Sequence, residues 1–599
     1  MSLTGNRTYF NSLARQLHEK HVKQYISMET FNNNEAHDEE IRYIPEHVTH
    51  LMLGRFFDQE LDDIPNSVTH LTIGFDYEKY YSNRECINIS TPNELAHSKL
   101  IQDCNTVIIS DKRNQRICNI PNNITHLFIG ENFYNILKKI PSSVTHLTFG
   151  NKFERFENSF YKFIKVIPNN IRHLNFGNAY DDCIKNVPYG VTHLTYGDNF
   201  NGYINGNIPN SVTHLKLGNR FNRKLENIPD SVTHLIIGDG YNRVIGIIPD
   251  SVTHLTIGNK FNKSLRNLTN NITHLTIGDG FNRRLQNLPR NLRYLTIGNT
   301  FEALFNQKLE NIPNTVTHLV LRGKFNQRLE NLPSNLIYLS LGYRFNRKLE
   351  NLPANLRRLK FKDYFNQRLE NLPDGITHLE LSKDFNRKLE NLPSNLIHLK
   401  LGLFFNRKLE NLPNKLTYLN LGSSFNQPLE NLPDSLKELG LGCDFTHPIE
   451  NLPKGLTHLY YSSGTELPDN LPPGLTHLYC DYTFNYSLEN VPSSVTHLFL
   501  DPVYNKKGRI YGFDTVPNSV KYLVLGEWHY SDVYEDEIKK IRNKNCVILV
   551  VKPTSIKDSN HCIFYNTPEN NKLLDEFENK NLLALKNKKL IEEINYLKL

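Results

Sequence analysis

The sequence lacks any long hydrophobic run, since nowhere do 18 or more apolar residues follow one another. A helix needs about 20 predominantly apolar residues to span a membrane. The first residues, Met1 to Arg7, also lack the apolar core of a signal peptide. We therefore expect a soluble, cytoplasmic protein that has no contact with a membrane.

Cysteine is sparse, and its spacing carries no motif. Eight cysteines are spread over 599 residues without a Cys-x-x-Cys pair or a fixed interval. This excludes a disulfide framework and the usual zinc motifs. The chain also lacks a phosphate-binding glycine loop and a nucleophile with a base at plausible spacing. We therefore predict that the protein is not an enzyme and holds no cofactor.

A strong charge of one sign is missing as well. The 69 Lys and Arg residues nearly balance the 62 Asp and Glu residues, which leaves a net charge of +7. Spread over so long a chain, this is a weak field, which does not favour nucleic acid as a partner. At 39% hydrophobic and 22% charged residues, the chain has enough apolar material to form a core and too little charge to stay disordered.

What the sequence does contain is a repeat of 20 residues. Pro333, Pro353 and Pro373 follow one another at this step, and phenylalanines keep the same interval. From Pro45 to Pro517 there are about 22 such units. The longest interruption, from residue 65 to 121, is expected to hold a loop or one degenerate unit near residues 107–109. A fixed period of this length is typical of a solenoid.

Each unit contains one short stretch in which apolar residues alternate, so we predict one short parallel strand per 20-residue coil. In the unit 392–411, Leu399 and Leu401 point inward and Gly402 ends the strand. No segment between the turns is long enough for a helix. Stacked coils should bury the recurring Leu positions and Phe405 as ladders. We expect the recurring Asn406 and Asn411 to be buried and to bond turn backbone.

The chain divides into three predicted parts. Residues 41–526 form the solenoid. Residues 1–40 form a helical N-terminal cap or F-box remnant, because Phe10, Leu13, Leu17 and Val22 have nearly helical spacing. Residues 527–599 form an α/β capping subdomain with a buried strand at 547–551 and a helix from Thr567 onward. A coiled-coil dimer arm is the alternative for the last segment.

The repeated motif Phe-Asn-x-x-Leu-x-x-Ile/Leu-Pro, as in Phe385-Asn386 with Leu392-Pro393, resembles the FNIP repeat, and the Ser231-to-Leu235 element that follows such a motif strengthens the likeness. FNIP repeats are similar to leucine-rich repeats and occur in proteins of social amoebae and of giant DNA viruses of amoebae. The resemblance implies a leucine-rich-repeat-like, non-catalytic protein-interaction solenoid, in the host cytoplasm if the source is viral.

Many giant-viral members of this family begin with an F-box, which docks a receptor onto the Skp1 adaptor of a cullin ubiquitin ligase. Only about 40 residues precede the first unit here, and the usual opening of an F-box is absent. The segment Arg7 to Leu13 resembles the last part of such a box. The resemblance therefore implies an alternative function, the substrate-recognition subunit of a ligase with a shortened F-box.

Histidine recurs at one position of 16 units, in the element Thr-His-Leu. Neighbouring coils would place these rings about 5 Å apart. A zinc site needs three or four converging ligands, and Tyr338 and Arg358 replace histidine in sister units, so we predict no metal site. Because stacked imidazolium ions repel one another, we expect the array to lose stability below about pH 6.

Basic and acidic residues also recur, as in Arg387-Lys388-Leu389-Glu390. Such rows are typical of a solvated face with charges paired along the stack. An uncompensated basic stripe would favour an anion or nucleic acid, and this remains the weakest of the functional alternatives because a glutamate row accompanies the basic rows.

One outward residue per coil lies between the two inward leucines, and its chemistry changes along the array from charged to aromatic. An open strand face is where solenoids present their binding surface, and aromatic residues dominate interface hot spots. We therefore predict an unidentified protein partner on this face. The candidate contact residues are Lys360, Glu380, Lys400, Asn420, Tyr460, Tyr461, Tyr479 and Phe499.

Overall fold

The computed structural model describes residues 122–129, 140–149, 167–178, 187–204, 208–462, 466–480, 487–500 and 515–523, and the backbone alone of 524–526 and of six further strands. Contacts divide the chain into two units. The first unit comprises mainly residues 1–263 and the second mainly residues 273–565. Each unit is described by itself.

Each predicted coil contributes one strand, and the strand begins five residues after the recurring proline position. The strands of the first unit are β1 (Ile26–Glu29), β2 (His50–Gly54), β3 (His70–Phe75), β4 (Ile87–Ile89), β5 (Thr106–Ser110), β6 (His126–Ile129), β7 (His146–Phe149), β8 (His173–Asn175), β9 (His193–Thr195), β10 (His214–Leu217), β11 (His234–Ile237) and β12 (His254–Ile257).

The second unit continues the same pattern. Its strands are β13 (His274–Ile277), β14 (Tyr294–Ile297), β15 (His318–Leu321), β16 (Tyr338–Leu341), β17 (Arg358–Phe361), β18 (His378–Glu380), β19 (His398–Lys400), β20 (Tyr418–Asn420), β21 (Glu438–Leu441), β22 (His458–Tyr461), β23 (His477–Cys480), β24 (His497–Leu500), β25 (Tyr522–Gly526) and β26 (Val547–Val551).

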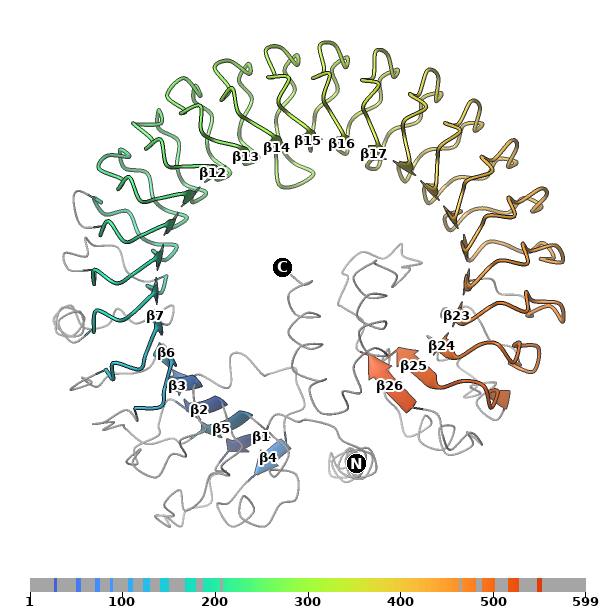
Figure 1. Ribbon diagram of the computed structural model, residues 1–599, viewed down its shortest axis with the longest axis horizontal. Helices are drawn as coiled ribbons and strands as arrows, with labels where there is room; N and C mark the ends of the chain where they lie inside the picture. Colours follow the sequence, from blue (N-terminus) through green and yellow to red (C-terminus); the bar gives the residue numbers. More distant parts are fainter. Residues whose placement is uncertain are drawn as a thin grey trace, which may run out of the picture. The chain divides into compact units, whose positions relative to one another are not determined.

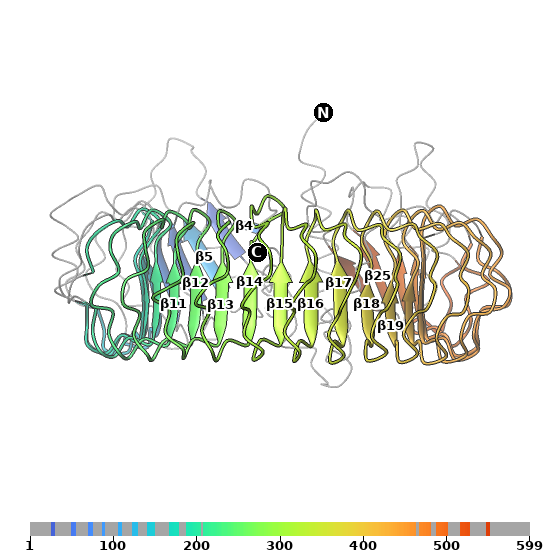
Figure 2. The same cartoon turned by 90° about the horizontal axis from the view of Figure 1, so that it is seen from above.

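The strands pair in parallel and in the register that the 20-residue period demands. On β18 and β19, His378 lies opposite His398 and Glu380 lies opposite Lys400. The strand arrows of each unit point the same way in Figure 2. The prediction of a parallel solenoid with one strand per coil is confirmed.

The first strands depart from sequence order. Strand β3 pairs directly with β6, so the segment between them adds no coil to the row at that place. Strand β5, the predicted degenerate unit, pairs instead with β2, and β1 pairs with both β5 and β4. The chain therefore leaves the stack after β3, extends its N-terminal edge and then returns.

The predicted apolar ladders form the core. In the coil of β19, Leu396, Leu399, Leu401 and Phe405 are all buried, with at most 2% of their surface exposed. Equivalent phenylalanine rings stack from coil to coil with centroids 6.1–6.2 Å apart and nearly parallel planes. A single coil could not bury these side chains, so each coil depends on its neighbours for its core.

The recurring asparagines hold the turns together, but both are exposed rather than buried as predicted. The Oδ1 atom of Asn406 accepts a hydrogen bond from the backbone N–H of Asn426. In the same way, the Oδ1 atom of Asn386 accepts a hydrogen bond from the backbone N–H of Asn406. Asn411 has a φ of 55°, in the left-handed region that asparagine tolerates better than other non-glycine residues. The two positions recur for different reasons, cross-coil bonding and turn conformation.

A glycine follows most strands, and at Gly402 it is required by close approach of the neighbouring coil. A Cβ atom at Gly402 would lie 1.6 Å from the carbonyl oxygen of Ser382 in the preceding coil. A side chain at residue 402 would require a shift of the neighbouring coil, so Gly402 allows these two coils to stack closely.

Both units curve toward their strands. In the first unit, histidine rings on the strands stack 4.0–4.2 Å apart, whereas the aromatic rings of Phe200, Phe221, Tyr241 and Phe261 across the coil lie 6.0–6.2 Å apart. The same number of coils thus spans less distance on the strand side. Figure 1 shows the strands on the concave side of the second unit as well.

The predicted terminal helices lie outside the described residues. Within residues 1–40 only β1 is described, and within residues 527–599 only β26, the strand predicted there. Among the described residues there is no α-helix, and hence none that could span a bilayer. The three-part division of the chain and the F-box remnant therefore stay predictions.

Candidate functional site

The concave side of the strands carries two lanes of partly exposed side chains. We call the first residue of each strand the histidine lane and the residue two positions later the central lane; together they form the strand face. The residues between and after them are buried, as the alternating burial of β12 shows. The lanes arise because successive side chains of a strand point to opposite faces.

In the first unit the histidine lane is a continuous column of stacked rings. Its centroids lie 4.0–4.2 Å apart over seven strands. The members of the column are His126, His146, His173, His193, His214, His234 and His254.

A threonine before most of these histidines fixes the orientation of the ring. The Oγ1 atom of Thr233 lies 2.9 Å from Nδ1 of His234 and also donates to the carbonyl oxygen of Thr213, 3.2 Å away. The same carbonyl oxygen also accepts the backbone N–H groups of Thr233 and His234, at 2.9 and 3.0 Å. The threonine therefore ties the ring to the backbone pairing between the two coils.

Stacking and partial burial oppose protonation of the column. Desolvation lowers the pKa of His146, and His126 on the adjacent strand and His193 two strands away lower it further. The pKa of His214 is lowered by desolvation and then by His193 and His234. Protonation of His146 and His214 is therefore less favourable than that of a free imidazole.

The stacked geometry is poorly suited to a metal ion. Parallel rings direct their ring nitrogens side by side, whereas zinc needs ligands that converge on one point about 2 Å from each. In the described part of the chain, no group of three or more His, Cys, Asp and Glu residues could hold a metal ion.

In the second unit the central lane becomes charged over β17 to β19. The Nζ atom of Lys360 lies 2.6 Å from Oε2 of Glu380, and both side chains are about one-third exposed. Lys400 lies in register on the other side of Glu380 and is exposed. Although burial raises it, the pKa of Glu380 is lowered overall, chiefly by Lys360 and then by Lys400.

Other side chains at this place were not among the predicted contact residues. Arg358 takes the place of histidine on β17, and Lys362 takes that of the usual glycine after the strand. Desolvation lowers the pKa of Lys362, and the nearby charge of Lys360 adds to this effect. In the sequence, the replacement of the recurring glycine by lysine was the signal that could have identified Lys362 as a residue of this site.

Farther along the second unit both lanes become aromatic. In the central lane, the Tyr479 ring stacks between Tyr460 and Phe499, with centroids 4.2 and 4.1 Å apart. In the histidine lane beside it, His477 stacks between His458 and His497 at 4.1 and 4.2 Å. Tyr479 and Phe499 are half-buried. Two adjacent columns of rings therefore line the concave side of β22 to β24.

Three predicted contact residues are buried instead. Tyr460 is 3% exposed and Asn420 is 2% exposed, although both lie in the central lane. Tyr461 is 2% exposed, lies opposite Leu441 in the inward position, and donates from its hydroxyl to the carbonyl oxygen of Glu466, 3.2 Å away. The alternation of the strand itself places Tyr461 inside, so the structure does not bring it onto the strand face.

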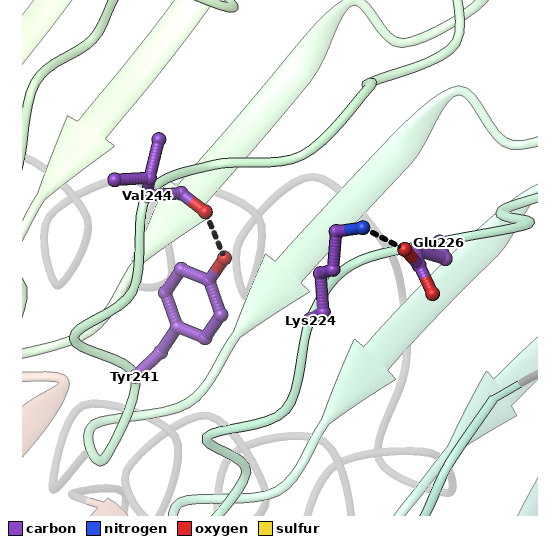
Figure 3. A network of polar contacts seen from close by, with 4 residues as sticks. All are labelled: Lys224, Glu226, Tyr241 and Val244. Atoms are coloured by element: carbon purple, nitrogen blue, oxygen red, sulfur yellow. Dashed lines mark hydrogen bonds and ion pairs between the residues drawn. The ribbon is translucent and has the colours of Figure 1, made fainter.

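The basic and acidic rows lie outside the strand face, and their charge pairs form within a coil instead of along the stack as predicted. Arg368 and Glu370 are 3.9 Å apart, with 75% and 55% of their side chains exposed. Lys224 and Glu226 pair in the same way. Figure 3 shows this pair together with a separate contact, in which the Tyr241 hydroxyl donates to the carbonyl oxygen of Val244. Pairs this exposed contribute little to stability.

Comparison with known proteins agrees with this architecture. The model of the FNIP repeat family matches residues 40–76, 114–152, 184–220, 201–240, 221–260, 261–300, 305–344, 325–364, 345–384, 365–404, 405–444 and 425–463. No curated protein matches the chain.

Two solved structures are similar to the chain. CroV588, a circular leucine-rich-repeat protein of a giant virus, is 34% identical over 85% of this chain and 83% of its own, with a TM-score of 0.59. YopM from Yersinia enterocolitica is 21% identical over 66% of this chain and 86% of its own, with a TM-score of 0.40. Repeats of this kind are typical protein-interaction scaffolds and are generally non-catalytic.

Proposed function

The chain belongs to the FNIP repeat family, and on that premise we propose that it is a non-catalytic scaffold that binds a protein partner through the strand face of its second unit. The observation that carries the proposal is the stacked pair of Tyr479 and Phe499. These half-buried rings are ordered by their neighbours before any partner arrives, so binding would cost little side-chain entropy.

The orientation of the rings favours a protein over a nucleic acid. Both faces of Tyr479 are covered, by Tyr460 on one side and by Phe499 on the other. Nucleobases and cations bind aromatic faces. Only ring edges remain for a ligand, and edges suit the edge-to-face contacts and apolar packing that aromatic and aliphatic side chains of a protein provide.

The test is quantitative capture of proteins from amoebal cytosol by the tagged full-length chain and by two variants. Tyr479→Ser with Phe499→Ser removes the rings from the strand face. Tyr189→Ser removes a tyrosine that is 83% exposed in a turn, as the matched control. We expect a protein that the wild type and the control recover equally and that the double variant loses.

Circular dichroism must show that the double variant keeps its fold. Equal recovery of every bound protein by all three chains would contradict the proposal. Recovery of Skp1 in a manner that does not depend on Tyr479 and Phe499 would instead support the ligase-receptor alternative.

A further inference from the structure

We propose that the partner presents an extended segment with two parts, one or more carboxylates facing β17 to β19 and apolar or aromatic side chains facing β23 and β24. This inference rests on the proposed function and specifies the chemistry of its partner. The two parts of the site lie on the same strand face of the same unit, so one segment crossing the strands could contact both.

The charged part is unbalanced in favour of cations. On the two lanes of β17, β18 and β19, the cations are Arg358, Lys360 and Lys400, and Glu380 is their one carboxylate. Glu380 bonds Lys360 at 2.6 Å. Lys400 lies in register with it on the next strand and is exposed. A second carboxylate supplied by a partner would complete an alternating row on this lane.

The histidines beside this row add no positive charge at neutral pH. Burial lowers the pKa of His398 to about 4, and burial together with Arg358 lowers that of His378. The attraction for an anion therefore comes from the lysines and from Arg358. Lys362, just beyond the end of β17, adds a further cation and is followed by Asp363.

On β20 and β21, between the two parts of the site, the central lane carries no charged or aromatic side chain. Its two residues on β20 and β21 are Asn420, whose Oδ1 accepts from the backbone N–H of Gly422, and Gly440, which has no side chain. In the histidine lane of the same strands, Tyr418 stacks on His398 with centroids 4.0 Å apart, and Glu438 is half-buried. A partner segment that follows the central lane would cross these strands without contacting the Glu438 carboxylate. Contacts would thus concentrate at the two ends of the crossing.

The strand spacing sets the length of the partner segment. Lys400 on β19 and Tyr479 on β23 are four strand steps apart. At about 4.1–4.8 Å per step they are separated by roughly 16–19 Å, which an extended chain covers in about five or six residues. The partner segment is therefore predicted to carry its carboxylates about five or six residues from its apolar side chains, in either chain direction.

The test is selection of binders from a phage-displayed library of random 16-residue peptides on the full-length chain. Affinities of the enriched peptides are then measured by fluorescence anisotropy. We expect enrichment of Asp or Glu at a spacing of about five or six residues from Leu, Phe, Trp or Tyr. The variant Lys360→Glu with Lys400→Glu should weaken binding by about tenfold or more, as truncation of a close interfacial charge pair does.

Two controls keep the test decisive. Lys388→Glu with Lys408→Glu makes the same charge change at exposed residues outside the strand face. This variant should alter the affinity less than about twofold, because exposed charges outside the site contribute little. Replacing the peptide carboxylates by the corresponding amides should reproduce the loss without any change to the protein, so a misfolded variant cannot decide the result.

The outcomes separate this inference from the proposed function. Enriched peptides that lack carboxylates but lose affinity for Tyr479→Ser with Phe499→Ser would overturn the two-part partner and leave the protein-binding face intact. Peptides that bind every strand-face variant as well as the wild type would overturn both. Selection without enrichment would overturn the inference, because the face would then not recognise an extended segment.

Discussion

The backbone N–H of Asn426 donates to the Oδ1 atom of Asn406 at 3.0 Å, and this bond joins two successive coils. The Nε2 atom of Gln427 donates to the same oxygen, also at 3.0 Å. The relationship repeats through Asn326, Asn346 and Asn366, each of which accepts from the coil that follows. The turns therefore have a hydrogen-bond ladder of their own, separate from the strand pairing.

Asn406→Ala is predicted to destabilise the fold, because the amide of Asn426 and the side chain of Gln427 lose their acceptor. The expected cost is about 1 kcal/mol, the usual net value of a hydrogen bond. Asn406→Asp keeps an acceptor oxygen at the same place and should cost less. Urea denaturation of the full chain measures both, and equal losses for the two variants would contradict the role of the side-chain oxygen.

Asn411→Ala is predicted to cost about 1–2 kcal/mol, because its φ of 55° crowds the Cβ atom of an L-residue. Asn411→Gly should be tolerated, since glycine adopts this conformation freely. Asn414, three residues later and exposed, does not have a positive φ and serves as the control for an Asn→Ala change. If Asn411→Gly were as harmful as Asn411→Ala, the side chain and not the backbone conformation would be what matters.

Gly402→Ala is predicted to be among the most damaging small substitutions in the array. The new Cβ would meet the carbonyl oxygen of Ser382 at 1.6 Å, so the neighbouring coil must shift. Overpacking of this kind costs about 1–3 kcal/mol or more. Gly474→Ala is the control, because its Cβ would lie 3.5 Å from the nearest atom, the carbonyl oxygen of Lys454. A thermal melt of each variant compares them.

Mild acid is predicted to destabilise the fold through the histidine lane. Burial first, and then His458 and His497, lower the pKa of His477 to about 3. An unfolded histidine has a pKa of about 6.5. The unfolded chain therefore binds more protons below pH 6.5, and stability falls progressively from there toward the folded pKa values near 4 for His398 and 3 for His477.

The measurement is the melting temperature between pH 7.5 and pH 4.5 at constant ionic strength. It should fall with pH, and less steeply for the variant His398→Gln with His477→Gln. A melting temperature that stays constant over this range would contradict the expected cost of charging the lane.

The 20-residue period was enough to predict the strands, their parallel pairing and the phenylalanine ladder, because each depends only on contacts with the adjacent coils. Exposure in the central lane was harder to predict. Asn420 and Tyr460 have the spacing of surface residues but are buried, and burial depends on what surrounds a position and not on its spacing. The pairing of β5 with β2 was equally inaccessible, since it departs from sequence order.

The strand face illustrates the same limit. Alternation predicted Lys360, Glu380 and Lys400 as one outward lane, and the structure adds which of the two lysines lies closest to the carboxylate. The curvature, set by ring spacings of about 4 Å on one side and 6 Å on the other, comes from the combined shape of a whole coil. No single residue of the repeat indicates it.

Because the same asparagine bond joins each pair of these successive coils, one coil can take the place of another. Asn406 accepts from one neighbour and donates its own backbone N–H to another, so removing a whole coil joins a donor to an equivalent acceptor. Recombination between repeats in the gene could thus lengthen or shorten the array in steps of one strand without leaving a broken bond. Each such event would move the charged and aromatic parts of the strand face relative to each other, so copy number alone could retune which partner the protein recognises.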